Sequence, residues 1–227
     1  MDVSEILTRV KAVIDELSNL GNQDVTGEEN TQNLDSIIKD KIPYALEWVL
    51  QNAPQNKIDS SMISSYTGGD STTEEKLKAT IGYNNVVTVE LPDSFLRVLS
   101  AKLSSWFYSP TPVSEFSDVA LMQQGRTTMG SPDKPATVLC TEGGKSVLKM
   151  YTAAPGDRED ISAKVSVQLI NTPSVSGTAT SIDVPIKLEK SFIYYIAYLT
   201  LLAFRDASAA SFYQVAASDL GAEDKNQ

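Results

Sequence analysis

The segment FIYYIAYLTLLAF at residues 192–204 decides the fold, because it is the longest apolar run in the chain and follows a region rich in β signals. Its apolar side chains cover the whole circumference of a helix, and a helix of this kind is buried on all sides. The run has 13 residues, whereas a membrane span takes about 20. We therefore expect a C-terminal core helix over 191–221, with part of its burial supplied by a neighbouring copy of the chain.

Two more helices are expected at the other end of the sequence. Apolar residues recur at helical spacing over 3–20, up to Gly21, and again over 34–50. Pro43 lies inside the second pattern and predicts a kink or a break. Residues 1–54 are thus expected to form N-terminal helices.

Between the N-terminal helices and the β-rich part, the chain has two segments of different composition. Residues 55–85 form an expected polar loop that contains SSYTGGDSTTEE. Over 86–130 we expect a strand at VVTVELP, then a helix carrying Phe95, Leu99, Leu103 and Trp106, then an irregular segment with one short helix around 116–125.

A β-rich insertion is expected over 131–190. ATVLCT and SVLKMYT, joined by EGGK, predict a hairpin whose glycines supply positive φ. Alternation from Ile161 to Leu169 predicts a strand with one buried face, and Pro185 places a further strand over 182–188 at a sheet edge. With a frayed tail at 222–227, the expected class is α+β: a helical bundle of N-terminal helices and a long C-terminal helix, carrying an inserted antiparallel β-rich subdomain.

The inventory of reactive side chains argues against an enzyme. The chain has no histidine and one cysteine, which removes the commonest general base, the Ser-His and Cys-His nucleophile pairs and any Cys/His zinc site. Cys140 lies in an expected strand as a buried structural thiol. TEGGKS at 141–146 matches only the end of a phosphate-binding loop, and a hairpin turn is favoured. We expect no catalytic, cofactor-binding or metal-binding residues.

The charge distribution argues against tight binding of nucleic acid. Acidic residues outnumber basic ones by 29 to 19, and residues 1–80 hold 14 of the acids against 7 bases. Affinity for phosphates comes mainly from clustered Lys and Arg, and the sequence has no basic run. An acidic wall past which DNA slides without binding is still compatible with this pattern.

Two groups of residues are candidates for contacts with other molecules. Tyr194, Tyr195 and Tyr198 do not share one helical stripe, so at least one should face a different partner from the others. The candidate subunit interface comprises Tyr194, Tyr195, Tyr198, Phe204, Phe212 and Tyr213. The candidate partner-contact loop comprises Tyr66, Gly68, Gly69 and Asp70. A cluster at 106–108, WFY, is read as core or interface packing, with stacking on a base or a sugar as the alternative.

Three pieces of sequence carry a family resemblance: LPDSFLRVLSAKLSSW at 91–106, KPATVL at 134–139 and the alanine-rich end of the last helix. In the order of its elements the chain resembles head-to-tail adaptor or ring proteins, the portal-proximal connectors of podovirus-like tailed phages, those of crAss-like Bacteroides phages in particular. The long polar stretch at 55–80 has no counterpart in that pattern.

The resemblance implies a dodecameric ring in the neck of the virion, below the portal, assembled in the cytoplasm of the bacterial host. Its partners would be further copies of itself, the portal protein and other neck or tail proteins, with double-stranded DNA only in transit and no membrane. Two alternatives stay open. One is another virion component, a tail hub or capsid-associated subunit, and the other is a soluble ligand-binding or regulatory module with its site near Trp106.

Overall fold

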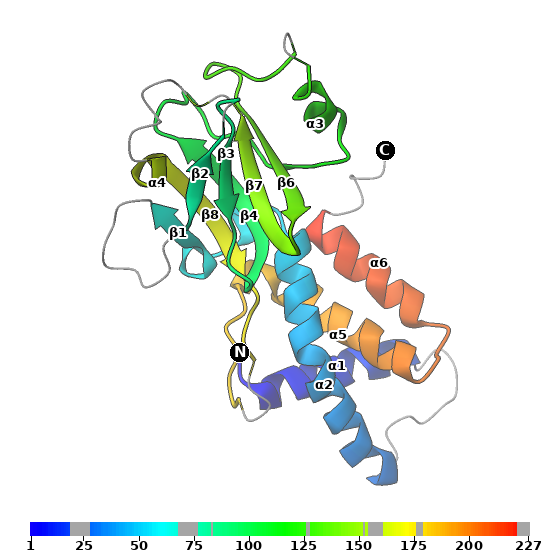
Figure 1. Cartoon of the computed structure of the whole chain (residues 1–227). Helices are drawn as coiled ribbons and strands as arrows, with labels where there is room; N and C mark the ends of the chain where they lie inside the picture. The colour runs from blue at the N-terminus through cyan, green and yellow to red at the C-terminus, as the bar shows by residue number, and fades with distance from the viewer. Residues whose placement is uncertain are drawn as a thin grey trace. The chain divides into compact units, whose positions relative to one another are not determined.

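The computed structural model describes residues 1–18, 28–67, 77–82, 84–125, 128–151, 153, 161–175 and 179–221. The chain is an α+β protein, as expected, and divides into two compact units (Figure 1). Unit 1 comprises Met1–Ser60 and Pro173–Gln227, and unit 2 comprises Ser61–Thr172. Unit 2 is thus an insertion between two parts of the helical unit, and it begins far earlier than the 131–190 expected from the sequence.

Unit 1 is a bundle of helices. Its elements are α1 (Val3–Ser18), α2 (Glu28–Asn52), α5 (Glu189–Ala203), α6 (Ala209–Leu220) and the short 3₁₀ turns η1 (Gln55–Lys57) and η4 (Ile186–Leu188). A second short turn, η2 (Ser60–Met62), spans the boundary with unit 2. The expected N-terminal helices are confirmed. None of the described helices is long and apolar enough to cross a membrane.

The helices pack through apolar residues four positions apart. On α1, Ile6, Val10 and Ile14 are buried at that spacing, which is the stripe the sequence predicts. Ion pairs flank the packing: Arg9 binds Glu189 of α5 at 2.9 Å, and Lys11 binds Asp35 of α2 at 2.6 Å. These partly exposed pairs orient the helices, whereas the buried apolar area stabilises them.

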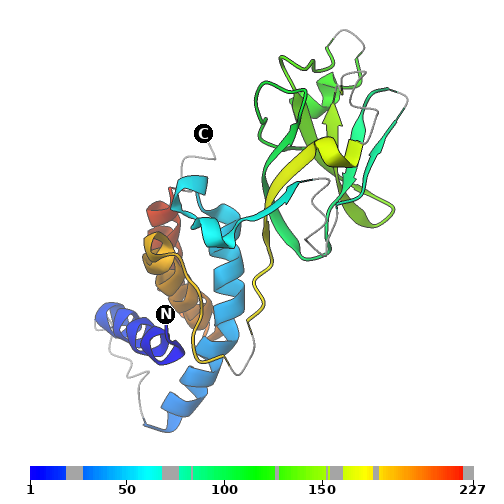
Figure 2. The same cartoon turned by 90° about the vertical axis from the view of Figure 1, so that its left-hand side faces the viewer.

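Helix α2 passes through Pro43 without a break. Proline removes one main-chain hydrogen bond and presses on the preceding turn, so a bend is the expected response. The α2 ribbon changes direction along its length (Figure 2). Ala45, Leu46, Val49 and Leu50 are buried beyond the proline, and their packing holds the helix together.

The single helix expected over 191–221 is wrong, because the chain forms two helices there. Helix α5 ends at Ala203, and Arg205 adopts a left-handed φ of 57° before α6 begins. The amide of Asp206 bonds to the carbonyl of Leu201 at 3.0 Å, which closes the turn. Helix α6 then ends at Gly221, whose φ of 73° makes it a left-handed cap.

Unit 2 contains two sheets. Its strands are β1 (Ser64–Thr67), β2 (Ala79–Ile81), β3 (Val87–Glu90), β4 (Phe95–Leu103), β5 (Val113–Ser114), β6 (Ala136–Glu142), β7 (Lys145–Tyr151) and β8 (Val165–Asn171). One sheet has the order β1-β8-β4 and the other β2-β3-β7-β6-β5; all described pairings are antiparallel except β5 with β6. Two short helices, α3 (Asp118–Met122) and α4 (Ile161–Lys164), complete the unit.

The inner faces of the two sheets share one core. Val87 and Val89 of β3 and Leu148 and Met150 of β7 alternate inward from one sheet. Ala101, Leu103, Val165, Val167 and Leu169 contribute from the other. Period-two alternation thus sets the core of unit 2.

The β6–β7 hairpin is confirmed, with Glu142 opposite Lys145 and positive φ at Gly143 and Gly144. Cys140 is buried within it, as expected of a structural thiol. The short helix expected around 116–125 and the strand in VVTVELP are confirmed as α3 and β3.

The strand with one buried face expected from Ile161 to Leu169 is confirmed from Val165 onward as β8, and the residues before it form the helical turn α4. Three other expectations about unit 2 and its flanks are wrong. The helix expected after Pro92 is the long strand β4. Over 182–188 there is a 3₁₀ turn and no strand. The polar loop expected over 55–85 contains β1 and β2.

Candidate interaction surfaces

A cluster of four aromatic rings joins three helices of unit 1. The rings of Trp48 on α2 and Tyr195 on α5 stack at 3.9 Å with planes 3° apart. Tyr213 of α6 lies 5.8 Å from Trp48, and Tyr198 lies 5.3 Å from Tyr213. These separations suit favourable aromatic pairs. The cluster therefore fixes α2, α5 and α6 to one another.

The cluster continues into exposed side chains, and together they form what we call the aromatic face. Tyr44 lies one turn before Trp48 on α2 and is 62% exposed. Leu202 lies one turn beyond Tyr198 on α5 and is 52% exposed, and Tyr213 is 41% exposed. The aromatic face comprises Tyr44, Trp48, Tyr195, Tyr198, Leu202 and Tyr213.

Burial, followed by the influence of Tyr198 and Tyr213, raises the pKa of Tyr195 to about 12. The phenol is consequently neutral across the physiological range. It offers a flat ring and a hydroxyl, which is chemistry for binding and not for proton transfer near pH 7.

The six candidate interface residues divide between the surface and the interior. Tyr195, Tyr198 and Tyr213 belong to the aromatic face, and Phe204 is 45% exposed at the end of α5. Tyr194 instead packs against Phe212, with ring centroids 6.2 Å apart. The expectation that at least one of the three tyrosines of α5 faces a different partner from the others is confirmed, because Tyr195 and Tyr198 contact each other and Tyr194 does not share their cluster.

Phe212 itself is 1% exposed and belongs to the interior of the bundle. Its assignment to a subunit interface is therefore wrong. Tyr213 is the next residue along α6 and is rotated by about 100° from Phe212, so the two adjacent rings lie on different sides of the helix, one buried and one partly exposed.

The candidate partner-contact loop is not supported at Tyr66. This residue lies in strand β1, opposite Val167, and packs against the core of unit 2. It is therefore a sheet residue and not a loop residue. Gly68, Gly69 and Asp70 lie outside the described residues.

Trp106 is 2% exposed and is part of the core of unit 2, which confirms the packing interpretation of the 106–108 cluster for this residue alone. A ligand site built on this indole is excluded by its burial. Its two neighbours differ from it: Phe107 is 79% exposed and Tyr108 is 49% exposed.

Those two residues begin a second exposed surface, which the sequence did not predict. Phe116 is 85% exposed, and Leu121 and Met122 of α3 are more than half exposed, while Ala120 is the buried residue of that helix. The exposed apolar side chains of this 107–122 segment are Phe107, Tyr108, Phe116, Val119, Leu121 and Met122. Exposed apolar residues gathered in this way are typical of contact sites.

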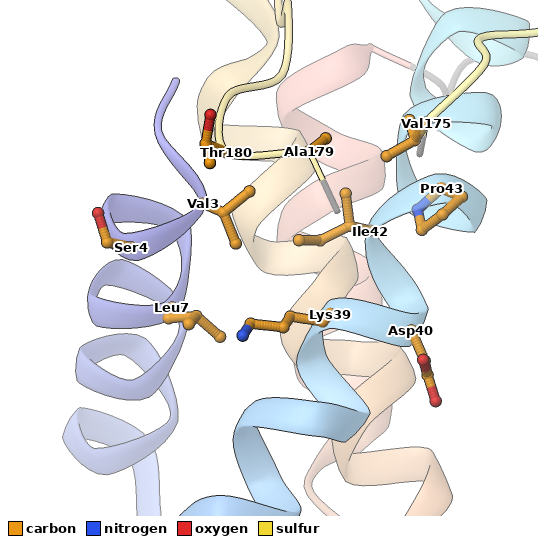
Figure 3. Close-up of a pocket in the computed structure, with 10 residues that line it drawn as sticks. All are labelled: Val3, Ser4, Leu7, Lys39, Asp40, Ile42, Pro43, Val175, Ala179 and Thr180. Atoms are coloured by element: carbon orange, nitrogen blue, oxygen red, sulfur yellow. The ribbon is translucent and has the colours of Figure 1, made fainter. Parts of the chain in front are cut away.

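A groove of about 510 Å³ lies within unit 1, between α1, α2 and the segment that leads toward α5 (Figure 3). Val3 and Leu7 line it from α1, and Ile42 lines it from α2. Lys39 extends from α2 toward α1, whereas Asp40 points away (Figure 3). Apolar walls with one ammonium group suit an inserted side chain of a partner better than a reaction.

Within the described part of the chain, no three His, Cys, Asp or Glu residues are grouped as a metal site would require. Burial raises the pKa of the Cys140 thiol, which makes it a poor nucleophile.

No protein-family model matches this chain, and comparison with curated proteins finds no match either.

Proposed function

We propose that this protein is a non-enzymatic structural subunit that assembles into a ring at the head-to-tail neck of a tailed phage. In this role it lies below the portal, leaves a passage for the genome and offers a docking surface for tail proteins. It is a component of the virion and assembles in the cytoplasm of the host bacterium.

The observation that carries the proposal is the aromatic face. Tyrosine and tryptophan are enriched in protein interfaces, where they bury a large area at a small cost in side-chain entropy. At a formal charge of −10, two copies of the chain repel each other. Self-association is therefore favoured through a surface built of uncharged rings, and the aromatic face is such a surface.

A ring also needs a second surface on each subunit. In cyclic assemblies of more than two copies the contact is heterologous, so that one patch of each subunit meets a different patch of the next. The exposed apolar residues of the 107–122 segment supply a second candidate patch on unit 2. Two distinct exposed surfaces on one chain support a closed ring over an isolated subunit.

The assignment to a phage neck rests on the resemblance in element order, together with the bundle and its inserted β unit. We propose a ring of about 12 copies by that resemblance, with the portal protein and other neck or tail proteins as neighbours. The acidic net charge disfavours tight binding of DNA, which is what a protein needs if the genome is to pass along it. A tail hub or capsid-associated subunit is the second candidate, since it would use the same exposed surfaces with a partner other than portal.

Light scattering on the purified chain, alone and mixed with portal protein, tests this function. Wild-type protein should associate, and Tyr44→Ser combined with Tyr213→Ser should leave it monomeric because both rings leave the aromatic face. Ile186→Ser is the matched control: Ile186 is 84% exposed, but it lies before the start of α5 and outside the aromatic face.

The control should assemble as the wild type does. Circular dichroism must show that the double variant keeps its helices. A wild-type chain that stays monomeric at every concentration, with and without portal, contradicts the proposal. Full assembly by the double variant contradicts it equally.

A further inference from the structure

Part of the outer face of the five-stranded sheet in unit 2 is polar, although Val138, Cys140 and Val147 are buried on that same face. On β7, Leu148 and Met150 point into the core, so Lys149 and Tyr151 project from the other side. Thr88 of β3 lies directly opposite Lys149 on the same outer side. Thr88, Lys149 and Tyr151 thus form a polar floor on strands whose opposite face packs in the core of unit 2.

Two loops flank this floor, and the open groove between them has a volume of about 910 Å³. One wall carries Asn84 and Asn85, between β2 and β3, and the other carries Gln123 and Gln124, after α3. Small-molecule sites commonly occupy about 300–1,000 Å³. The groove therefore suits a ligand of several rings better than a single ion.

Backbone and side-chain hydrogen bonds fix both walls. The buried Gln123 amide donates to the carbonyl of Val119 at 2.9 Å, and its oxygen accepts from the amide of Gly130 at 2.8 Å. In the other wall Asn85 takes a φ of 56°, and its carbonyl accepts from the amide of Ala153 at 2.9 Å. Walls held in this way are preorganised, so a ligand does not have to order them.

The charged side chains among the described lining residues neutralise each other. Lys149 and Glu142 form an ion pair of 2.5 Å. The bond to Glu142 raises the pKa of Lys149, which keeps its ammonium charged and paired. An anionic ligand such as a phosphate would have to break this pair, so the lining favours an uncharged one.

The remaining polar groups both donate and accept hydrogen bonds. The exposed amides of Asn84 and Gln124 each carry two donors and one acceptor oxygen, and Thr88 adds a hydroxyl. The Gln123 amide is bonded within its own wall and is not counted among them. Tyr151 is half-buried at the floor, and burial raises its pKa, so it stays a neutral phenol with a flat ring. Alternating donors and acceptors beside an aromatic ring match a neutral molecule with many hydroxyl groups.

From this arrangement we infer that unit 2 holds a binding site for a neutral oligosaccharide on the outer face of its five-stranded sheet. Amides from the two walls hydrogen-bond the sugar hydroxyls, and the Tyr151 ring contacts the apolar face of a sugar. This site lies wholly within unit 2 and does not involve the aromatic face. It would give the protein a contact with glycans in addition to its contacts with other subunits.

Saturation-transfer NMR on the full chain tests the inference, because it detects weak ligands even on a large assembly. The probes are maltotriose, cellotriose and triacetylchitotriose, with methyl phosphate, whose methyl protons report transfer, and a neutral Gly-Ser peptide as comparison ligands. At least one trisaccharide should give saturable transfer, and methyl phosphate should give none. Asn84→Ala and Gln124→Ala remove one exposed amide from each wall, and each should weaken binding by about tenfold or more.

Lys78→Ala is the matched control, because Lys78 is an exposed residue of unit 2 that pairs with Glu90 and does not line the groove. It should bind as the wild type does, and unchanged thermal unfolding should show that the two wall variants remain folded. Three results overturn the inference: no saturable transfer from any trisaccharide in the millimolar range, trisaccharide binding that neither wall variant weakens, or binding of the peptide alone.

Discussion

Phe212 and Tyr213 are adjacent on α6, but the first is buried and the second is partly exposed, so their alanine variants should separate folding from assembly. Phe212 is 1% exposed, and its replacement by alanine leaves a cavity between α5 and α6. Truncation of a buried phenylalanine costs about 3–5 kcal/mol. Tyr213 is 41% exposed, and its ring contacts Trp48, Tyr195 and Tyr198, so its loss forfeits three aromatic pairs worth together about 2 kcal/mol.

Urea unfolding followed by far-UV circular dichroism measures the first effect, at a concentration where the variants are monomeric. Light scattering over a concentration series measures the second. Phe212→Ala should unfold at much lower urea than the wild type. Tyr213→Ala should lose clearly less stability than Phe212→Ala and should associate less than the wild type. Equal losses of stability in the two variants would refute the assignment of Phe212 to the interior and of Tyr213 to the surface.

The remaining predictions concern local groups. Burial raises the pKa of Tyr195 from 10.0 to about 12. The stability that its neutral phenol contributes is therefore complete below pH 10 and is lost as the pH rises toward 12. Unfolding experiments on Tyr195→Phe should show a smaller decline in stability over this range. The amide and hydroxyl of Ser208 lower the pKa of Asp206, so Asp206→Ala should destabilise the fold by about 1 kcal/mol at neutral pH, and the difference should shrink as the pH falls below 3.8. Gly144 has a φ of 80°, so Gly144→Val should lower the free energy of unfolding by about 1–2 kcal/mol in thermal unfolding experiments. Gly82→Ala should leave stability close to that of the wild type, because no atom lies within 3.7 Å of the added carbon.

Strand β4 shows why part of the fold could not be predicted from sequence. Its register shifts between Phe95 and Arg97 and again between Val98 and Ser100, so Val98 and Leu99 are both buried. A β-bulge inserts a residue and interrupts period-two alternation. The resulting spacing of apolar residues imitates a helix. The β6–β7 hairpin was predictable because its two glycines mark the turn directly.

The break between α5 and α6 was hidden for a related reason. No glycine or proline occurs over 204–208, and the turn depends on a left-handed arginine at position 205. The expected single helix therefore had no stop signal. The turn interrupts the helical periodicity, so the buried side of α6 does not follow from that of α5. The inward position of Phe212 could therefore not be predicted either.

The aromatic face could be predicted only in part. The tyrosines of α5 are conspicuous in the sequence, but Trp48 joins them from a helix about 150 positions earlier. Tyr66 looked like a loop residue because polar residues surround it, yet pairing with β8 places it in a sheet. The 107–122 segment went unrecognised because α3 has five residues, too few for a periodic pattern to identify its buried side.

The central claim is assembly into a closed ring, and electron microscopy of the purified chain with portal protein tests it most directly. Class averages should show rings of a single cyclic symmetry stacked on portal, and Tyr44→Ser combined with Tyr213→Ser should abolish them. Particles that remain isolated subunits at every concentration, or open filaments that never close, would contradict the account.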